Sequence, residues 1–327
     1  MFIINNKNNN KGKNMNNLKK IGLTALAASL VTTSAFAGEM SVAGSASIGV
    51  KNTTGTNTAL GKSWTMGNQL TFTGGGELDN GMNVSLSFII DQADDSTTGL
   101  ANSPFDSHSV TISSDALGSF KFSGEGGSSA QGAMDAGAAG DLWNNGTGVA
   151  EITGAAAGNN SMFYTLPSMV DGLEVTASMS PGKAAQETHT SYGVAYTGVE
   201  GLTVKFGQGD SGAPGAEIES TTMMASYAIG SFTVSASNTE ADKTGANNRE
   251  VRSYQVAYTL SDSMSATYGT ETYETVGSST DEEIDSLGVS YTTGGMTLSA
   301  TTFDTEGAGN TAGAKTERWA LGLSFAF

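Results

Sequence analysis

Runs of alternating side chains recur along the sequence and limit the fold more than any other feature. The last run has large apolar residues in one phase and small or polar residues in the other; the large ones are Trp319, Leu321, Leu323, Phe325 and Phe327. Period-two alternation puts the two sets on opposite faces of a β-strand. Such a strand can face lipid on one side and a wet lumen on the other. A half-buried strand of a soluble sandwich alternates in the same way.

The number and spacing of these runs favour a membrane barrel over a sandwich. We expect about 16 strands, in which turns of about two to six residues alternate with loops of roughly nine or more. Aromatic residues gather toward the strand ends, as in the girdles at membrane interfaces. The sequence therefore predicts an all-β, transmembrane, antiparallel up-and-down β-barrel with short turns at one end and longer loops at the other.

The N-terminal region has the three parts of an export signal. Lys19 and Lys20 form a positive segment, an apolar stretch runs from Ile21 to Val31, and Ala35-Phe36-Ala37 fits a small-x-small cleavage site. The alternative, a membrane anchor, is disfavoured because a spanning helix needs about 20 apolar residues. We predict that residues 1–37 are an N-terminal extension plus signal peptide that is removed, and that residues 38–327 form a single barrel domain.

Composition restricts the partners of the exported chain. Loss of residues 1–37 removes five Lys and no acid, so the full-length charge of −17 becomes −17 − 5 = −22. This balance argues against nucleic acid, which needs clustered Lys and Arg. It favours cations, and we expect no cofactor beyond divalent cations such as Ca²⁺ at acidic loops, for example Asp281, Glu282 and Glu283. The chain has no Cys and therefore no disulfide.

The strand phase also predicts which charges face the lumen. The inward bases are Lys121, Lys205 and Arg318, and the inward acids are Asp91, Glu125 and Glu174. The long Gly/Ala-rich segment 126–160 adds Asp135, Asp141 and Glu151, and structureless loops of this length are usually functional or disordered. The first three predicted strands carry no inward base. Rings of charge set ion preference in pores, although such charges can also merely keep a lumen wet.

One family resembles this sequence over essentially the whole exported chain. The segment Asn160-Ser161-Met162-Phe163-Tyr164-Thr165-Leu166-Pro167, after a long third loop, resembles the segment after the constriction loop of Gram-negative general porins, including the alphaproteobacterial type. The turn Leu117-Gly118-Ser119-Phe120, the signal peptide and the terminal Phe327 are similar too.

The resemblance implies several properties that the residues alone do not. It implies a homotrimer of 16-stranded barrels, a third loop folded into the lumen, and passive diffusion of ions and small hydrophilic solutes. It also implies that the final strand with Phe327 is the assembly signal for the barrel assembly machinery. Outer-membrane lipid and lipopolysaccharide would surround the barrel. We then expect an acidic constriction of Glu125, Asp135, Asp141 and Glu151 facing a sparse basic wall, and hence a preference for cations.

Two alternatives from other classes stay open at this point. An outer-membrane hydrolase would need His or paired acids in a fixed constellation. His108 falls on the outward phase, and His189 lies at a predicted loop edge with no partner nearby in sequence. A structural or adhesive barrel without an open pore is the other alternative. The metal ligands, if any, are unknown from the sequence.

Overall fold

The computed structural model describes residues 40–56, 61–91, 106–135, 138, 142, 154–182, 187–245 and 248–327. The predicted signal peptide and its cleavage site lie outside these residues and stay a prediction. Sixteen strands account for most of the described chain. In the first half they are β1 (Met40–Gly55), β2 (Gly61–Glu77), β3 (Asn83–Asp91), β4 (Ser107–Ser114), β5 (Gly118–Glu125), β6 (Ser161–Thr165), β7 (Leu173–Ser180) and β8 (His189–Tyr196).

The second half contains the longer and more regular strands. They are β9 (Leu202–Ala213), β10 (Ala216–Ile229), β11 (Phe232–Lys243), β12 (Arg249–Ser261), β13 (Met264–Thr275), β14 (Glu282–Thr293), β15 (Met296–Glu306) and β16 (Lys315–Ala326). Two short helical segments, α2 (Ala130–Met134) and η2 (Ala308–Asn310), lie in connections between strands.

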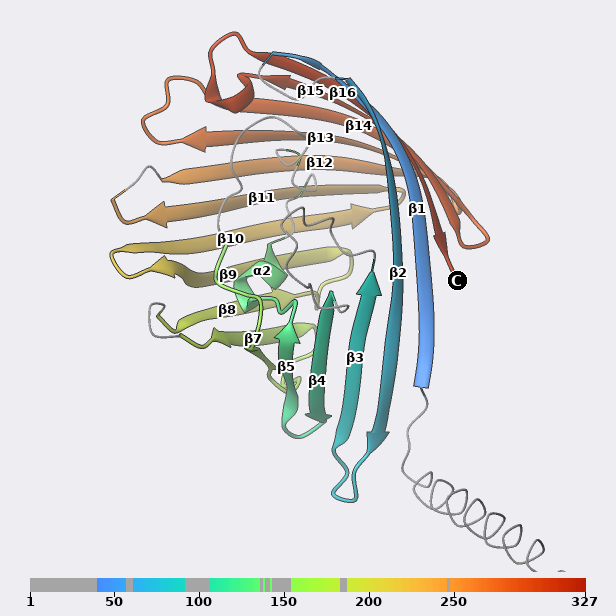
Figure 1. Ribbon diagram of the computed structural model, residues 1–327, viewed down its shortest axis with the longest axis vertical. Helices are drawn as coiled ribbons and strands as arrows, with labels where there is room; N and C mark the ends of the chain where they lie inside the picture. The colour runs from blue at the N-terminus through green and yellow to red at the C-terminus, as the bar shows by residue number, and fades with distance from the viewer. Residues whose placement is uncertain are drawn as a thin grey trace, which may run out of the picture.

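The strands form one closed antiparallel barrel in chain order (Figure 1). Each strand pairs with the next, and β1 pairs with β16 to close the ring, with Ile48 opposite Leu323 and Val50 opposite Leu321. Closure leaves no unpaired strand edge, so every strand can satisfy its backbone groups within the ring. This confirms the predicted fold class and strand number. Among the described residues, no helix is long and apolar enough to cross a membrane.

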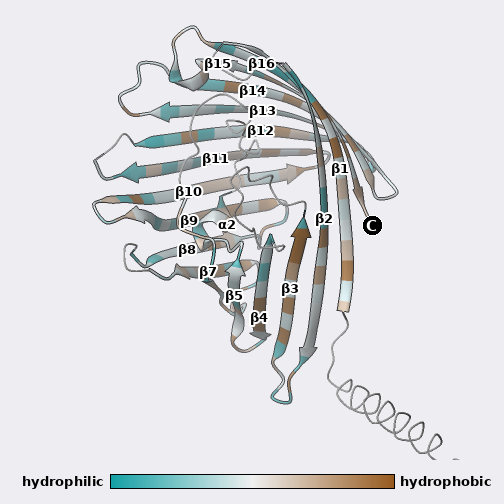
Figure 2. Cartoon of the chain, in the orientation of Figure 1, coloured by the Kyte–Doolittle hydropathy of each residue, from teal (hydrophilic) through white to brown (hydrophobic). Residues whose placement is uncertain are grey.

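The distribution of apolar side chains is the inverse of that in a soluble protein. Large hydrophobic residues cover the outside, for example Trp64 and Met66, whose exposed fractions are 75% and 66%. The fully buried side chains include many Ser and Thr, such as Thr176, Ser191 and Thr222. Brown and pale bands alternate along the strands in Figure 2 as the two faces alternate. A soluble sandwich would bury the large residues, so this surface fits a barrel surrounded by lipid.

Several polar segments that the sequence predicted as loops are instead strand. The polar residues 51–63 lack apolar alternation and predict a loop, but β1 continues to Gly55 and β2 begins at Gly61. The connection between β9 and β10 is only Pro214 and Gly215, although a long loop was expected there. These extensions carry polar residues on both faces, so they lack the apolar alternation that marks a strand in sequence. In these polar segments the backbone hydrogen bonds alone continue the pairing of neighbouring strands.

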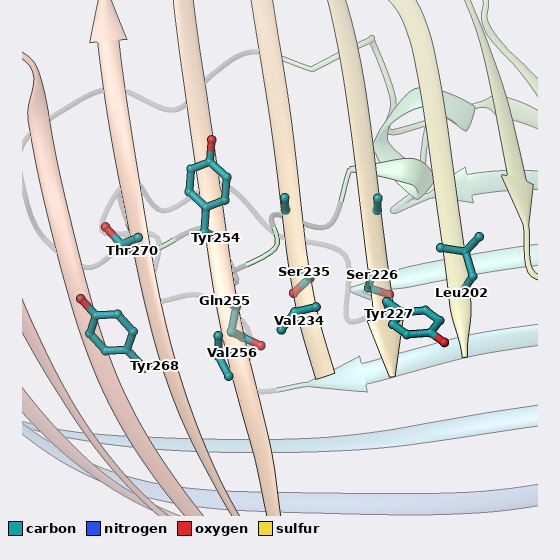
Figure 3. Close-up of a pocket in the computed structure, with 12 residues that line it drawn as sticks. Leu202, Ser226, Tyr227, Val234, Ser235, Tyr254, Gln255, Val256, Tyr268 and Thr270 are labelled. Atoms are coloured by element: carbon teal, nitrogen blue, oxygen red, sulfur yellow. The ribbon is translucent and has the colours of Figure 1, made fainter. Parts of the chain in front are cut away.

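Tyrosines are confined to one part of the barrel wall. Eight of the nine Tyr residues lie on the outward faces of β6, β8, β10, β12, β13 and β14, and the ninth, Tyr273, faces inward and is buried. Tyr227, Tyr254 and Tyr268 surround an apolar hollow of about 470 Å³ whose floor includes the register pair Ala225 and Ala236 (Figure 3). Strands β1 to β5 carry no Tyr. The outward aromatic residues on that side are Trp and Phe, for example Trp64 and Phe120.

Candidate pore lining

The described part of the loop between β5 and β6 lies inside the barrel, where helix α2 rests against the inner wall (Figure 1). Ser129 caps the helix by accepting a hydrogen bond from the Gly132 N–H at 2.9 Å. The Ala130 N–H donates to the hydroxyls of Ser178 on β7 and Ser191 on β8, both at 2.9 Å. Side-chain hydroxyls of the wall thus satisfy backbone groups at the start of the helix. The described part of the loop confirms the predicted inward fold.

Gln131 joins the two limbs of this loop to the wall. Its side chain is fully buried. Its amide nitrogen donates to Thr222 Oγ1 on β10 at 2.8 Å, and its amide oxygen accepts the Ala155 N–H of the returning limb at 2.9 Å. The adjacent Ala156 N–H donates to the backbone oxygen of Asp210 on β9 at 2.9 Å. One buried amide therefore holds both limbs against the wall.

Glycines on the inner wall make room for the helix. A Cβ atom built on Gly207 would lie 2.9 Å from the Cα of Gln131, and one built on Gly193 would lie 2.7 Å from the backbone oxygen of Ala130. Real Cβ atoms essentially never approach other atoms this closely. These two positions need Gly because the backbone of α2 occupies the space of a side chain.

The next described residues of the loop contact the inner wall at β11 and β14. Asp135, at the end of α2, accepts a hydrogen bond from Thr239 Oγ1 on β11 at 2.9 Å. The Ala138 N–H donates to Ser237 Oγ at 2.7 Å. Leu142 packs on Ile284 of β14, with Phe303 of β15 against the same cluster. Asp135 therefore lies on the inner side of the wall, whereas Asp141 and Glu151 lie outside the described residues.

The three predicted wall bases lie on inward faces, but the sequence missed three others. Lys121 is opposite Thr111 on β4, Lys205 is opposite Ala195 on β8, and Arg318 is opposite Phe303 on β15. The expectation that the first three strands carry no inward base is wrong, because Lys51 on the extended β1 faces inward opposite Ala320 and Ser63. The other inward bases are Lys243 and Arg249. All three lie in segments that were predicted to be loops, where no phase was assigned.

Glu125 does not continue the inward row of β5. The register between β4 and β5 shifts at His108 and Ser109, so Glu125 pairs with His108 instead of following Ser123. Its Oε2 lies 3.9 Å from the Nδ1 of His108, which shares its phase with Val110. The bulge inserts one residue and reverses the alternation after it. The inward phase predicted for Glu125, on which its place in the constriction depended, is therefore wrong.

Two of the three acids that were expected to hold cations on a loop are strand residues. Glu282 faces inward on β14, is fully buried, and accepts the Gly309 N–H at 2.7 Å. Glu283, its neighbour on the same strand, faces outward and is exposed. Among the residues that the structure describes, no group of three His, Asp or Glu side chains is arranged to hold a metal ion. Bound divalent cations stay a prediction without a described site.

Most of the negative charge of the strands is on the outside of the barrel. The described strands carry inward acids at Glu77, Asp91, Glu174, Glu271 and Glu282, against six inward bases. Twelve further acids face outward on β9 to β16: Asp210, Glu217, Glu219, Glu240, Asp242, Glu250, Glu274, Glu283, Asp285, Asp304, Glu306 and Glu317. The net charge of the chain therefore does not describe the charge of the lumen wall.

His189 has a partner that the sequence did not indicate. It begins β8, is mostly buried, and its Nδ1 lies 2.7 Å from Asp210 Oδ2 on β9. Asp210 Oδ1 accepts hydrogen bonds from the Thr190 N–H at 2.9 Å and from Thr190 Oγ1 at 3.2 Å. The pair links adjacent strands next to the returning limb of the loop, where it has a clear structural role.

The five residues proposed as an assembly signal form the outward row of β16. Leu321 and Leu323 pair with Val50 and Ile48 of β1, and Trp319 pairs with Asn52. Phe327 follows the strand and exchanges backbone hydrogen bonds with Gly44. The row therefore completes the outer surface at the closure seam, while its role in assembly stays a prediction.

A closed membrane barrel with a loop folded into a polar lumen defines the class of channel-forming outer-membrane proteins. A family model described as Gram-negative porin matches residues 22–282. The chain belongs to this family, as its sequence resemblance indicated. Family membership and the barrel together support a location in the outer membrane. A sequence comparison with curated proteins finds no match.

Solved structures share the fold at low sequence identity. An anion-selective porin from Comamonas acidovorans is 14% identical, with a TM-score of 0.68 over 88% of this chain and 99% of that one. OmpT of Vibrio cholerae is 16% identical, with a TM-score of 0.65 over 89% and 98% of the two chains. Salmonella typhi OmpF, in a complex with daunomycin, is 14% identical, with a TM-score of 0.65 over 89% and 98%. At these identities the likeness shows the fold alone.

Proposed function

We propose that this chain forms a water-filled channel through the outer membrane for passive diffusion of ions and small hydrophilic solutes. The observation that carries the proposal is the polar inner face of a closed 16-stranded barrel with a folded loop inside it. At about 16 strands, side chains no longer fill a barrel interior. We further propose that residues 1–37 direct export and are removed, and that the barrel assembly machinery inserts the chain among lipid and lipopolysaccharide.

Conductance of the purified protein in a planar bilayer tests the channel directly. We expect stepwise current increments that scale with KCl concentration. A structural or adhesive barrel would insert without such steps. A hydrolase would turn over ester substrates without conducting, and would lose that turnover when His189 is replaced by Gln.

We propose a modest preference for cations that is carried by the loop and not by the net charge. Asp135 is held on the inner side of the wall by Thr239, and the segment 126–160 contains no Lys or Arg. A negative loop in a narrow, low-dielectric passage enriches cations. The twelve outward acids lie on the other face of the wall, where water and salt screen them over about 10 Å at 0.1 M ionic strength.

Zero-current potentials across a KCl gradient separate the two groups of acids. Asp135→Asn should lower the cation preference of the wild type. Asp304→Asn removes the same charge from the outward face of β15 and should leave the potential unchanged. The assignment of Asp135 to the ion passage is wrong if Asp304→Asn changes the zero-current potential and Asp135→Asn does not.

We propose that the channel is a homotrimer whose subunits meet through the outward faces of β1 to β5. This side carries no Tyr, and the strand rows that cross β1 to β4 display no outward acid. Phe72 and Phe88 stack on this face with ring centroids 4.8 Å apart. A wall buried against protein needs no interfacial tyrosines, which agrees with the absence of Tyr from these strands.

Single cysteines can report on this interface because the chain has none. Met66→Cys places a thiol on the outward face of β2, and Met264→Cys places one on the outward face of β13. In native membranes a lipid-soluble maleimide should label residue 264 and spare residue 66. After heat has dissociated the trimer, the thiols at both positions should react with the maleimide. Equal labelling before heating would contradict the proposed interface.

A further inference from the structure

The inner wall contains a hollow at the seam where β16 meets β1. Its volume is about 380 Å³. Small residues form its floor, because Gly49 pairs with Gly322 and Ala320 lies one inward position further along β16. The neighbouring inward residues on β2 and β15 carry hydroxyls, namely Thr65, Ser299 and Thr301. The wall thus offers space for a small solute beside several hydrogen-bonding groups.

Two cationic side chains line the same hollow. Lys51 is opposite Ala320, and Arg318 is opposite Thr53, so the two bases are diagonal neighbours on one face of adjacent strands. Side chains in this relation lie within reach of one another. In the part of the chain that the structure describes, neither base forms a salt bridge with Asp or Glu. Two like charges are therefore left together without a protein counter-ion.

Arg318 is held by an aromatic ring instead of a carboxylate. Its guanidinium carbon lies 5.5 Å from the centroid of the Phe303 ring, and its Nε has no hydrogen-bond partner among the described residues. Phe303 also packs against the cluster of Leu142 and Ile284, so Leu142 of the inward loop helps to support the ring. A cation–π contact orients a guanidinium but leaves its charge uncompensated. This arrangement keeps the planar group available for a bidentate anion.

We propose that this hollow is a binding subsite for small solutes that carry an oxyanion, either a carboxylate or a phosphate group. Arg318 and Lys51 bind the oxyanion, and the hydroxyls of Thr65, Ser299 and Thr301 bind the polar remainder of the solute. The glycine and alanine floor provides the room. The subsite rests on the proposed function because the lumen is its route of access. Saturable binding of an anion at one place on the wall is compatible with an ion current that prefers cations because of the acidic loop.

Inorganic phosphate is the probe for this subsite. Single-channel KCl current is recorded at constant ionic strength and pH 7 while phosphate is increased, and equilibrium dialysis measures phosphate bound to detergent-solubilised protein. The wild type should show a saturable decrease in current and saturable binding. Loss of a charged hydrogen bond in Lys51→Gln/Arg318→Gln should weaken both by about tenfold or more. Arg318→Lys, which keeps the charge but not the fork, should weaken them less.

Two further variants separate a built site from general electrostatics. Lys121→Gln/Lys205→Gln removes the same two charges from inward positions elsewhere and should bind phosphate like the wild type. Ala320→Leu fills the hollow while it keeps both bases, and it should lose binding with an unchanged KCl potential. Heat-modifiable migration on gels confirms that each variant is folded.

The outcomes divide between the two proposals. The subsite is refuted if phosphate acts without saturation, if the Lys121/Lys205 variant weakens binding as much as the Lys51/Arg318 variant, or if Ala320→Leu binds normally. A protein that binds phosphate saturably but gives no current steps would refute the channel and keep the subsite. A protein that conducts but does not bind phosphate saturably would refute the subsite and keep the channel.

Discussion

At the scale of single residues, glycines determine where main chain and large side chains come together. The clearest case is Gly44 on β1. Its N–H donates to the Phe327 backbone oxygen at 2.6 Å, and the Phe327 N–H donates to the Gly44 oxygen at 3.0 Å. A Cβ atom at Gly44 would overlap the ring of Phe327. The terminal aromatic residue thus fits onto the first strand only because that strand has no side chain at this point.

Gly44→Val should therefore impair closure of the barrel although Val favours strands in general. We expect a lower yield of heat-modifiable protein, and we expect the same effect from deletion of Phe327. Gly74→Val is the matched control, because a Cβ at Gly74 has no atom within 4 Å. The yield is measured by gel mobility after refolding into detergent or lipid. Equal yields for the two Val variants would remove Gly44 from barrel closure.

At the scale of elements, the inward loop depends on one buried amide and on the hydroxyl and glycine row of the wall. Gln131 satisfies Thr222 and the Ala155 N–H together, so its loss leaves a buried N–H without an acceptor. Leaving a buried polar group unsatisfied costs about 1–3 kcal/mol. This cost destabilises the docked loop and not the pairing of the strands, because neither hydrogen bond of the Gln131 side chain connects two strands.

Gln131→Met keeps the volume of the side chain and removes both hydrogen bonds. We expect larger current fluctuations at fixed voltage, while the thermal unfolding of the barrel stays close to that of the wild type. Gln69→Met is the control, since Gln69 faces inward on β2 and donates within its own strand to Thr71 Oγ1 at 3.1 Å. If both variants have equally quiet channels, Gln131 does not hold the loop.

At the scale of the whole molecule, acids are opposite acids across the outer face of β14, β15 and β16. Asp285 pairs with Asp304, and Asp304 pairs with Glu317. Like charges directly opposite in a sheet are destabilising. In the next row Glu306 on β15 is opposite Glu283 on β14, but it also forms an ion pair with Lys315 on β16.

Asp304→Asn should stabilise the barrel by about 0.2–1 kcal/mol at low salt, and the gain should shrink as ionic strength rises. Glu306→Gln also removes a like charge, opposite Glu283, but it breaks the ion pair with Lys315, so it should give a smaller gain. Urea unfolding in lipid vesicles at two salt concentrations measures both. An equal gain from the two variants would show that only total charge matters.

The all-β class, the approximate strand number and the phase of the apolar runs can all be predicted from the amino-acid sequence. They can be predicted because lipid on one face and water on the other impose strict alternation, as in β3 and β16. The inward phase of Lys121, Lys205 and Arg318 follows from the same rule. Where both faces of a strand meet water, no alternation is imposed. The sequence therefore predicts loops for the outer halves of several strands among β9 to β16.

The remaining features follow from the tertiary structure, because they depend on which residues are opposite one another across strands. Lys51 became a lumen residue when β1 continued to pair with β2 and β16 beyond the lipid band. Glu125 left the inward row because one extra residue in β5 reversed the alternation. The seat of α2 joins residues far apart in the chain, such as Gln131 and Thr222. Barrel closure brings these groups together, and no local pattern in the chain encodes that.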